Sequence, residues 1–359
     1  MSAASASVLR SSAEPPDARG RELGSARHGA VAHTVSVYRR LFAASRGMQP
    51  DAIRAAGTRV RRTVASDFPD LAEEIDGIAE GSGVDAAELF AVNARTELLA
   101  GTLRGECSTI AVREGGRAAL MQNWDWHPEL APSRLLWIVE PGDGRWFATF
   151  TEAGILAKVG LNGHGLALCL NLLATTDDGG LHGLPVHLAL RLVLERCASI
   201  DDVAALLAGS RFGASSCMTV MSADGETGVF EIHPGGAARL PVEDGWAAHT
   251  NHFLTALPAG TVDVIRRDWP DTEARLARVR ATLDASPTEE AAREALCDHT
   301  GSPVSVCCHA GENPAFLERQ QTLASLLMRP SQSEMLVAWG YPCRHGYESV
   351  ELPRVRSAG

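Results

Sequence analysis

The hydrophobic pattern of the chain changes its period at Cys107. Before it, apolar side chains within residues 30–101 recur at helical spacing, as Leu71, Ile75 and Ile78 do at i, i+4 and i+7. From Cys107 onward, short apolar and β-branched runs are separated by Gly-Gly, Pro-Gly-Asp-Gly and Asn-Gly turns, which is typical of antiparallel hairpins. We therefore expect a helical N-terminal region followed by a mostly antiparallel sheet.

Local breaks divide the helical region into shorter pieces. The helical spacing of residues 31–65 predicts one or two surface helices. The Asp-Phe-Pro segment at 67–69 ends this helical stretch. Gly81–Gly83 ends the next helix, and Asp85 with Glu88 three residues later is typical of an N-terminal cap. Residues 30–101 are thus expected to be mostly helical, after a polar and frayed start.

Two groups of strands are predicted, each accompanied by helices. The first group is expected at 107–112, 117–123, 134–140, 146–151, 156–161 and 165–173, before a helix that starts at Pro185 and a short one at 201–207. The second group is expected at 216–222, 227–232, 236–241 and 246–251, then helices at 266–283 and 288–297, and last strands at 322–328 and 334–339. This order predicts an α+β fold in which two stacked sheets lie between helical layers, an αββα sandwich.

Charge and composition limit the class of partner. The 359 residues include 44 acidic and 33 basic side chains, and the resulting net charge of −11 disfavours nucleic acid and anionic membrane surfaces as partners. No signal-like apolar segment occurs in residues 1–20, and no run of about 18 apolar residues occurs anywhere. We expect a cytoplasmic protein that acts on a small molecule or a peptide.

The eight cysteines show no disulfide-framework spacing, as expected for a reduced compartment. Two short segments, 297–299 (Cys-Asp-His) and 307–309 (Cys-Cys-His), bring three cysteines and two histidines together. Their spacing differs from that of common zinc fingers, and adjacent cysteines on a strand point to opposite faces. The sequence therefore predicts no metal site.

Cys107 is the candidate nucleophile. It opens a β-branched run directly after a helical segment, and residues 121–126 form a second strand that carries Asp125. A hairpin of these two strands would bring a thiol and a carboxylate within reach of each other. The alternative is an inert cysteine at the start of a strand.

Several motifs occur in the same order as in a known family. They are Gly-x-Cys-Ser-Thr at 105–109, Gln-Asn-Trp-Asp-Trp at 122–126 and the segments 151–160, 185–191 and 249–252, followed by Arg319 with Thr322-Leu323. Together they resemble the isopenicillin N acyltransferase (acyl-coenzyme A:6-aminopenicillanic acid acyltransferase) family of N-terminal nucleophile (Ntn) hydrolases, over roughly residues 20–342. The resemblance implies the Ntn αββα fold.

The resemblance also implies a precursor that cuts itself between Glu106 and Cys107. The products would be a small, mainly helical chain 1–106 and a catalytic chain 107–359, held together as one folded unit. A thiol of pKa about 8.5 needs a base, and the freed α-amine of Cys107, with a pKa of about 7.7–8.0, could take its proton. The family commonly has glycine before the cysteine, so Glu106 at that position predicts slow cleavage.

Roles for other side chains follow from the same resemblance. Asp125 matches a carboxylate that would orient the nucleophile, and Asn251 matches an asparagine whose N–H would face the oxyanion, a donor worth about 3 kcal/mol. Asn171 resembles a second such donor. Arg319 matches an arginine beside the site, suited to pairing with Asp125 or with a substrate carboxylate.

Gln122 and Lys158 are supporting candidates beside these residues. Lys158 is the only lysine in the chain, which reflects either an arginine-biased composition or a site that needs a compact ammonium group. Plainer roles exist for the others: a strand-end cap for Asp125, a turn asparagine for Asn251 and a surface charge for Arg319.

The sequence thus predicts an Ntn cysteine amidohydrolase or acyltransferase that forms an acyl-Cys107 thioester. The acyl acceptor, water or an amine, stays open, and acyl-coenzyme A would be a substrate rather than a cofactor. The family implied by the resemblance includes penicillin acyltransferases and hydrolases of β-alanyl amides of biogenic amines. The alternatives are such a β-alanyl amine hydrolase, or an unprocessed scaffold that keeps the fold without catalysis.

Overall fold

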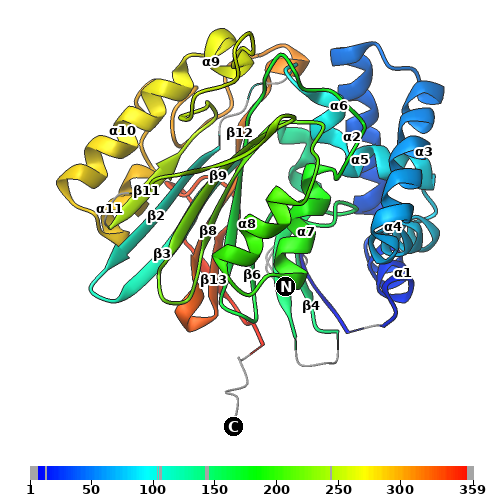
Figure 1. Cartoon of the computed structure of the whole chain (residues 1–359), viewed down its shortest axis with the longest axis horizontal. Coiled ribbons are helices and arrows are strands. Elements are labelled where there is room, and N and C mark those ends of the chain that lie inside the picture. The colour runs from blue at the N-terminus through cyan, green and yellow to red at the C-terminus, as the bar shows by residue number, and fades with distance from the viewer. Residues whose placement is uncertain are drawn as a thin grey trace.

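Two β-sheets stack face to face in the computed structural model, with helices on both outer faces and a block of N-terminal helices at one side (Figure 1). The structure describes residues 7–353, apart from 13, 103, 105–106, 142–144 and 243–244. This arrangement confirms the expected α+β sandwich.

The larger sheet has eight strands within the described residues, and all neighbouring pairs except β1 with β4 are antiparallel. In spatial order its strands are β1 (Val8–Ser11), β4 (Arg134–Val139), β5 (Phe147–Glu152), β6 (Val159–Asn162), β7 (Ala167–Leu172), β8 (Ser216–Met221), β9 (Thr227–His233) and β10 (Gly236–Leu240).

The smaller sheet is antiparallel throughout and carries the hairpin that starts beside Cys107. In spatial order its strands are β11 (Trp246–His249), β2 (Ser108–Glu114), β3 (Arg117–Trp126), β12 (Gln321–Arg329), β13 (Glu334–Ala338) and β14 (Glu348–Val350).

The helices fall into three groups. The N-terminal block contains α1 (Pro16–Ala26), α2 (His28–Arg46), α3 (Pro50–Asp67), α4 (Pro69–Ser82), α5 (Ala86–Asn93) and α6 (Arg95–Leu99). The larger sheet is covered by α7 (Val186–Arg196) and α8 (Ile200–Ala208), and the smaller one by α10 (Asp271–Ala285) and α11 (Glu289–Ala295), which α9 (Val264–Asp268) precedes. Short 3-10 turns lie at Pro128–Ser133, Phe316–Glu318 and Pro330–Gln332.

The predicted helix boundaries in the N-terminal region are confirmed by capping geometry. The side chain of Asp85 accepts hydrogen bonds from the backbone N–H groups of Ala87 (2.8 Å) and Glu88 (3.3 Å), which satisfies two of the free donors at the start of α5. Gly83, which follows α4, has a φ of +72°, a left-handed conformation that glycine adopts without steric cost.

Three parts of the secondary structure differ from expectation. The described part of the polar start is ordered: β1 pairs in parallel with β4, and α1 follows it. The strand β14, near the C-terminal end, was also missed. β1 and β14 are short strands at the edges of their sheets. They form because a neighbouring strand offers backbone groups for pairing, rather than because of their own hydrophobic pattern. The helix expected at 266–283 is divided, because Pro270 separates α9 from α10.

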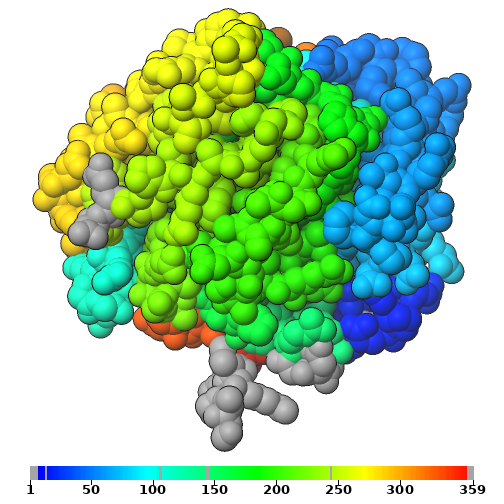
Figure 2. All heavy atoms as spheres, in the orientation of Figure 1, coloured from blue at the N-terminus to red at the C-terminus, as the bar shows by residue number. Residues whose placement is uncertain are grey.

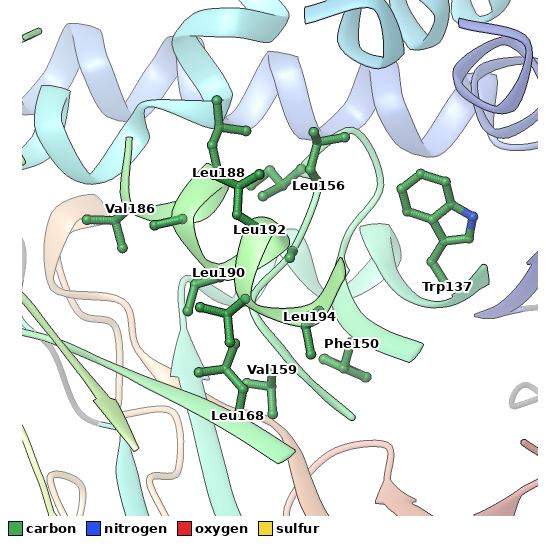
Figure 3. Close-up of a cluster of buried hydrophobic side chains, with 14 of the residues drawn as sticks. Trp137, Phe150, Leu156, Val159, Leu168, Val186, Leu188, Leu190, Leu192 and Leu194 are labelled. Atoms are coloured by element: carbon green, nitrogen blue, oxygen red, sulfur yellow. The ribbon is translucent and has the colours of Figure 1, made fainter. Parts of the chain in front are cut away.

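The core between α7 and the larger sheet consists of branched and aromatic side chains. Leu190 and Leu194 of α7 point toward Val159 and Leu168 of the sheet, whereas Leu188 and Leu192 lie on the opposite side of the helix, toward the N-terminal helices (Figure 3). All residues from Val186 to Leu194 are buried, because α7 has the sheet on one side and the N-terminal helices on the other. A helix that is buried around its whole circumference needs such double coverage.

The N-terminal block and the sandwich share one surface. On the face shown in Figure 2, the N-terminal residues (blue) lie directly against the region of α7 and α8 (green). The buried Arg191 of α7 pairs with Glu74 of α4 at 2.7 Å, which links the two parts through an ion pair. Among the described residues, no helix combines the length and apolar character needed to cross a bilayer.

Candidate active site

Cys107 immediately precedes β2, and the β2–β3 hairpin places it beside Asp125. The pairing of Ser108 with Asn123 sets the register, and the thiol of Cys107 donates to the backbone carbonyl of Asp125 over 3.6 Å. The expected proximity of the thiol and the Asp125 residue is therefore present in the fold. The thiol is buried, since Cys107 is only 6% exposed.

Two side chains from separate layers bind the backbone carbonyl of Cys107. Asn171, on β7 of the facing sheet, donates its Nδ2 to this oxygen at 3.0 Å. Arg275, on α10, donates its Nη1 to the same oxygen at 3.3 Å and to the Ser108 hydroxyl at 3.2 Å. The predicted donor Asn171 thus lies in direct contact with the candidate nucleophilic residue.

Gln122 supports Asn171 through a hydrogen-bond chain. The Nε2 of Gln122 donates to the Thr109 hydroxyl at 2.7 Å, and that hydroxyl donates to the Oδ1 of Asn171 at 2.7 Å. Because the amide oxygen of Asn171 is held in this way, its N–H₂ group must point toward the Cys107 carbonyl. The polar chain crosses between the two sheets.

Asn251 lies just after β11 and reaches Cys107 through Arg275. Its Oδ1 accepts a hydrogen bond from Nη2 of Arg275 at 3.0 Å, and its Nδ2 donates to the carbonyl of Leu172 at 2.9 Å. The residue is fully buried. Its role as an oxyanion donor stays a prediction, since its amide hydrogens bind a backbone carbonyl in this form of the chain.

Arg319 pairs with Glu129 rather than with Asp125, and its alternative role, pairing with a substrate carboxylate, stays a prediction. Arg319 lies in a surface turn with a side chain that is 41% exposed, and its Nη1 binds Glu129 at 3.0 Å. The arginine that donates a hydrogen bond to the Cys107 carbonyl is Arg275, which was not among the residues singled out from the sequence. A signal was available, because Arg275 shares the buried face of its helix with Leu276 and Val279.

A small cavity of about 20 Å³ lies beside the thiol. Cys107, Asp125 and Lys158 line it, together with Arg95 and Thr96 from the N-terminal region. Such a volume holds about one water molecule. Among the described residues, this cavity therefore has the walls of a site but is too small for a substrate.

Lys158 is held in the wall of this cavity by a carboxylate and an aromatic ring. Its ammonium group pairs with the buried Glu152 and lies 4.4 Å from the centre of the Trp124 ring. Burial lowers the pKa of Lys158 to about 7. This environment favours the second interpretation of the only lysine, a site that uses a compact ammonium group. Trp124 is buried.

The charges around Cys107 oppose one another. Burial raises the pKa of the thiol to about 12, and the nearby Asp125 carboxylate adds to the rise. The positive charges of Arg275 and Lys158 act in the opposite direction. At neutral pH the thiol of the uncut chain is therefore protonated and weakly nucleophilic.

Two further expectations concern segments next to these residues. The predicted cleavage bond between Glu106 and Cys107 lies partly outside the described residues, because Glu106 does.

The prediction of no metal site assumed that Cys307 and Cys308 lie on a strand, and this is wrong, since both lie in a loop between α11 and β12. The ligand atoms of His299, Cys307, His309 and Cys343 lie within 4.8 Å of one another.

Comparison with known proteins assigns the chain to a family. The model of the family described as acyl-coenzyme A:6-aminopenicillanic acid acyl-transferase matches residues 112–344. The chain belongs to this family. The matched region includes Asp125, Asn171, Asn251 and Arg275, and it begins shortly after Cys107.

Similarity to members of the acyl-transferase family extends beyond that region. The acyl-coenzyme A:6-aminopenicillanic-acid-acyltransferase 40 kDa form of Emericella nidulans is 29% identical over 299 residues, which cover 81% of this chain and 82% of that protein.

Solved structures show weaker similarity. The Caenorhabditis elegans ortholog of N-acylethanolamine-hydrolyzing acid amidase is 16% identical with a TM-score of 0.46, over 69% of this chain and 100% of that one. A mutant form of the conjugated bile acid hydrolase of Clostridium perfringens is 13% identical with a TM-score of 0.46, over 70% and 99%. The penicillin V acylase of Agrobacterium tumefaciens is 14% identical with a TM-score of 0.43, over 65% and 82%.

Proposed function

We propose that this chain is an Ntn cysteine enzyme that cuts itself before Cys107 and then moves small acyl groups through an acyl-Cys107 thioester. Membership of the acyl-transferase family supports the reaction class. The observation that carries the proposal is the position of Cys107 at the start of β2, with its carbonyl bound by Asn171 and Arg275. These contacts hold the residue as a new chain terminus would need to be held.

Self-cleavage would proceed by an N-to-S acyl shift. The Cys107 sulfur attacks the carbonyl carbon of Glu106, the C–N bond breaks, and the proton of the thiol passes to the departing nitrogen. Water then hydrolyses the thioester, which leaves a Glu106 carboxylate and restores the thiol. Since the pKa of this thiol is about 12 in the uncut chain, proton removal is unfavourable and slow processing is expected.

Turnover would use the amine that cleavage releases. With a reference pKa of about 7.7–8.0, the α-amine of Cys107 can accept the proton of its own thiol. The thiolate then attacks the acyl carbon of the substrate, and the amine returns the proton to the leaving group. Side-chain amides of Asn171 and Asn251 are the proposed donors to the oxyanion. Separation of the two new chain ends would widen the cavity of about 20 Å³ enough for a substrate.

The proposed substrate is a small N-acyl amide or an acyl thioester. The printed name of the Emericella nidulans relative includes acyl-coenzyme A and 6-aminopenicillanic acid, so both belong in a substrate panel. Hydrolysis of β-alanyl amides of biogenic amines is the second candidate within the same chemistry. All eight cysteines are free, which supports a reducing compartment such as the cytoplasm.

Denaturing electrophoresis with N-terminal sequencing tests the proposal. The wild-type protein should give two bands, and the larger should begin Cys-Ser-Thr. Cys107→Ala should stay as one chain, whereas Cys197→Ala, a matched change at another buried cysteine, should be cut like the wild type. A wild-type chain that stays uncut and shows no thiol-dependent acyl turnover would instead support the scaffold alternative.

Intact mass spectrometry with substrate present separates acyl transfer from binding. The larger chain should gain the mass of one acyl group when a slow substrate is added, and Cys107→Ala, which has no nucleophilic atom at this position, should gain none. Coenzyme A thioesters, phenylacetylated amides and β-alanyl amides form the panel. The acyl group that accumulates identifies the substrate class.

A further inference from the structure

Four side chains with metal-binding atoms meet where β12 begins and β13 ends in the smaller sheet, and none of them lines the cavity beside Cys107. His299, Cys307 and His309 belong to the loop between α11 and β12, and Cys343 follows β13. Cys307 is buried, His309 is half-buried, and the other two are exposed. None of them takes part in the proposed acyl chemistry.

Four of the six distances between their ligand atoms are close to the edges of a zinc tetrahedron, and all six are within 4.8 Å. With Zn–S near 2.3 Å and Zn–N near 2.0–2.1 Å, the edges are about 3.8 Å for S–S, about 3.5 Å for S–N and about 3.3 Å for N–N. The two sulfurs lie 3.7 Å apart. The Nε2 of His309 lies 3.5 Å from the sulfur of Cys307 and 3.3 Å from that of Cys343. The two Nε2 atoms of the histidines lie 3.2 Å apart.

Hydrogen bonding alone does not account for this arrangement. The Nε2 atom of His309 faces three polar atoms, those of His299, Cys307 and Cys343. An imidazole nitrogen either donates one hydrogen or accepts at one lone pair, so it can satisfy only one of these partners well. A cation at the centre would satisfy all four atoms together.

The surroundings hold the ligands in place. The ring of Tyr341 stacks on His309 with 4.0 Å between ring centres and 10° between planes, and the Tyr341 hydroxyl donates to Gln321 at 2.9 Å. The backbone of Cys307 donates to the Asp298 carbonyl at 2.9 Å and accepts from the Ser305 hydroxyl at 2.7 Å. Outer contacts of this kind orient metal ligands in proteins.

We propose that His299, Cys307, His309 and Cys343 bind a zinc ion as a closed structural site. Two thiolates and two imidazoles in a tetrahedron are a typical ligand set for zinc, and four protein ligands leave no position open for a substrate. The two thiols lose their protons to solvent when the ion binds. None of the four proposed ligands is a residue to which the acyl chemistry is assigned.

The ion would join the loop between α11 and β12 to the segment that follows β13. Hydrogen bonds connect this loop to β12 and to β3, the strand that carries Asp125. Cys308, beside the ligands, exchanges two hydrogen bonds with Thr322, which pairs with Asp125 across β12 and β3. Asn123 of β3 also donates to the carbonyls of Leu296 and Val306 at 2.8 Å each. Loss of zinc should therefore loosen the support of the Asp125 strand.

Metal analysis of the purified full-length protein is the first test. The wild type should contain about one zinc per chain. Cys343→Ser and His299→Asn, which change exposed side chains, should each lower the zinc content by about tenfold or more. Cys297→Ser, a matched change in the same loop, should retain it. Equal loss of zinc in Cys297→Ser would overturn this ligand set.

Cobalt substitution and intact mass provide independent readouts. Metal-free protein titrated with Co²⁺ should show the intense visible bands of a tetrahedral ion and a thiolate charge-transfer band, and both should vanish in Cys343→Ser. Zinc should also raise the unfolding temperature of the wild type but not of Cys343→Ser. Failure of the chain to take up either metal would overturn the proposal.

Intact mass spectrometry tests for a disulfide in place of the metal. A wild-type mass that is two hydrogens below the mass of the reduced chain, restored by reductant and not seen in Cys343→Ser, would instead show a Cys307–Cys343 disulfide and overturn the proposal.

Discussion

Individual buried charges define the candidate site, and Arg275 is the side chain that joins its parts. One guanidinium group contacts the carbonyl of Cys107, the hydroxyl of Ser108 and the amide oxygen of Asn251. Its Nε also lies 3.5 Å from the Asp271 carboxylate. A planar fork with five donors can reach several acceptors at once, whereas an ammonium group acts as a single point charge.

Replacing Arg275 by lysine should therefore slow self-cleavage and acyl turnover by about tenfold or more, mainly through kcat, because Cys107 and Asn251 are no longer held by one group. The time course of cleavage on denaturing gels and steady-state kinetics measure the effect. Arg280→Lys, an exposed change on the same helix, should behave like the wild type. Wild-type rates in Arg275→Lys would show that this bridge is not needed.

Glu97 is a second buried charge, at the end of the N-terminal helical block. Burial raises its pKa to about 7, although its Oε1 accepts a hydrogen bond from the backbone of Val186 at 2.9 Å. The folded chain thus binds a proton between pH 4.5 and 7 that the unfolded chain has released. The stability that Glu97 contributes is full below about pH 4.5 and is lost as the pH rises through about 7.

Glu97→Gln should remove this pH dependence. Its unfolding free energy relative to the wild type should rise between about pH 4.5 and 7 by about 3 kcal/mol and then level off. Urea unfolding at several pH values measures the difference. Glu73→Gln, an exposed change on α4, serves as the control and should show no such rise. A constant difference for Glu97→Gln across this range would contradict the assigned ionisation.

At the scale of elements, the contact between α1 and α4 depends on paired glycines. A Cβ atom at Gly20 would lie 2.1 Å from the carbonyl oxygen of Glu74, and one at Gly77 would lie 2.2 Å from that of Asp17. Gly24 and Gly81 repeat the arrangement one turn later, with contacts of 2.4 Å each. The two helices approach so closely that only glycine fits, and the ion pair of Arg19 with Glu74 at 2.6 Å lies beside this contact.

Gly77→Ala should destabilise the protein by about 2–3 kcal/mol, since the clash is with backbone that cannot move without separating the helices. Thermal or urea unfolding measures the loss. Gly29→Ala is the matched control, because a Cβ at Gly29 in α2 meets nothing within 4 Å. That control should be stabilising by up to about 1 kcal/mol, as expected for an exposed helical position. A neutral Gly77→Ala would show that the helices can separate at little cost.

At the scale of the whole molecule, one hydrophobic core crosses the predicted cleavage point. Side chains from the N-terminal helices, such as Phe42 and Phe90, belong to the same buried cluster as Leu188 and Trp126. Polar contacts join the two parts as well. Trp126 donates to the Tyr38 hydroxyl at 3.0 Å.

The products of self-cleavage should therefore stay together. The two chains should co-elute as one species in size-exclusion chromatography, at the volume of uncut Cys107→Ala, and a tag on either chain should recover both. They should separate only in denaturant, because exposure of the shared core is unfavourable in water. Elution of the fragment 1–106 in a separate fraction under native conditions would contradict this expectation.

The sequence by itself determined the fold class, the family and the position of the candidate nucleophile. Helical and two-residue periodicities, caps such as Asp85 and hairpin turns are local signals, so they predicted the order of elements and brought Cys107 near Asp125. The motifs around residues 105–109 and 122–126 were enough to indicate the acyl-transferase family, which the family model then matched.

Only the tertiary structure decided which distant side chains meet. It placed Arg275, rather than Arg319, against the Cys107 carbonyl, because the packing of α10 on the smaller sheet, rather than spacing along the chain, sets that contact. It also brought Cys343 to His299, Cys307 and His309, which lie close together in the sequence but far from Cys343. Contacts between layers depend on how whole elements pack, and local hydrophobic patterns carry no information about that registration.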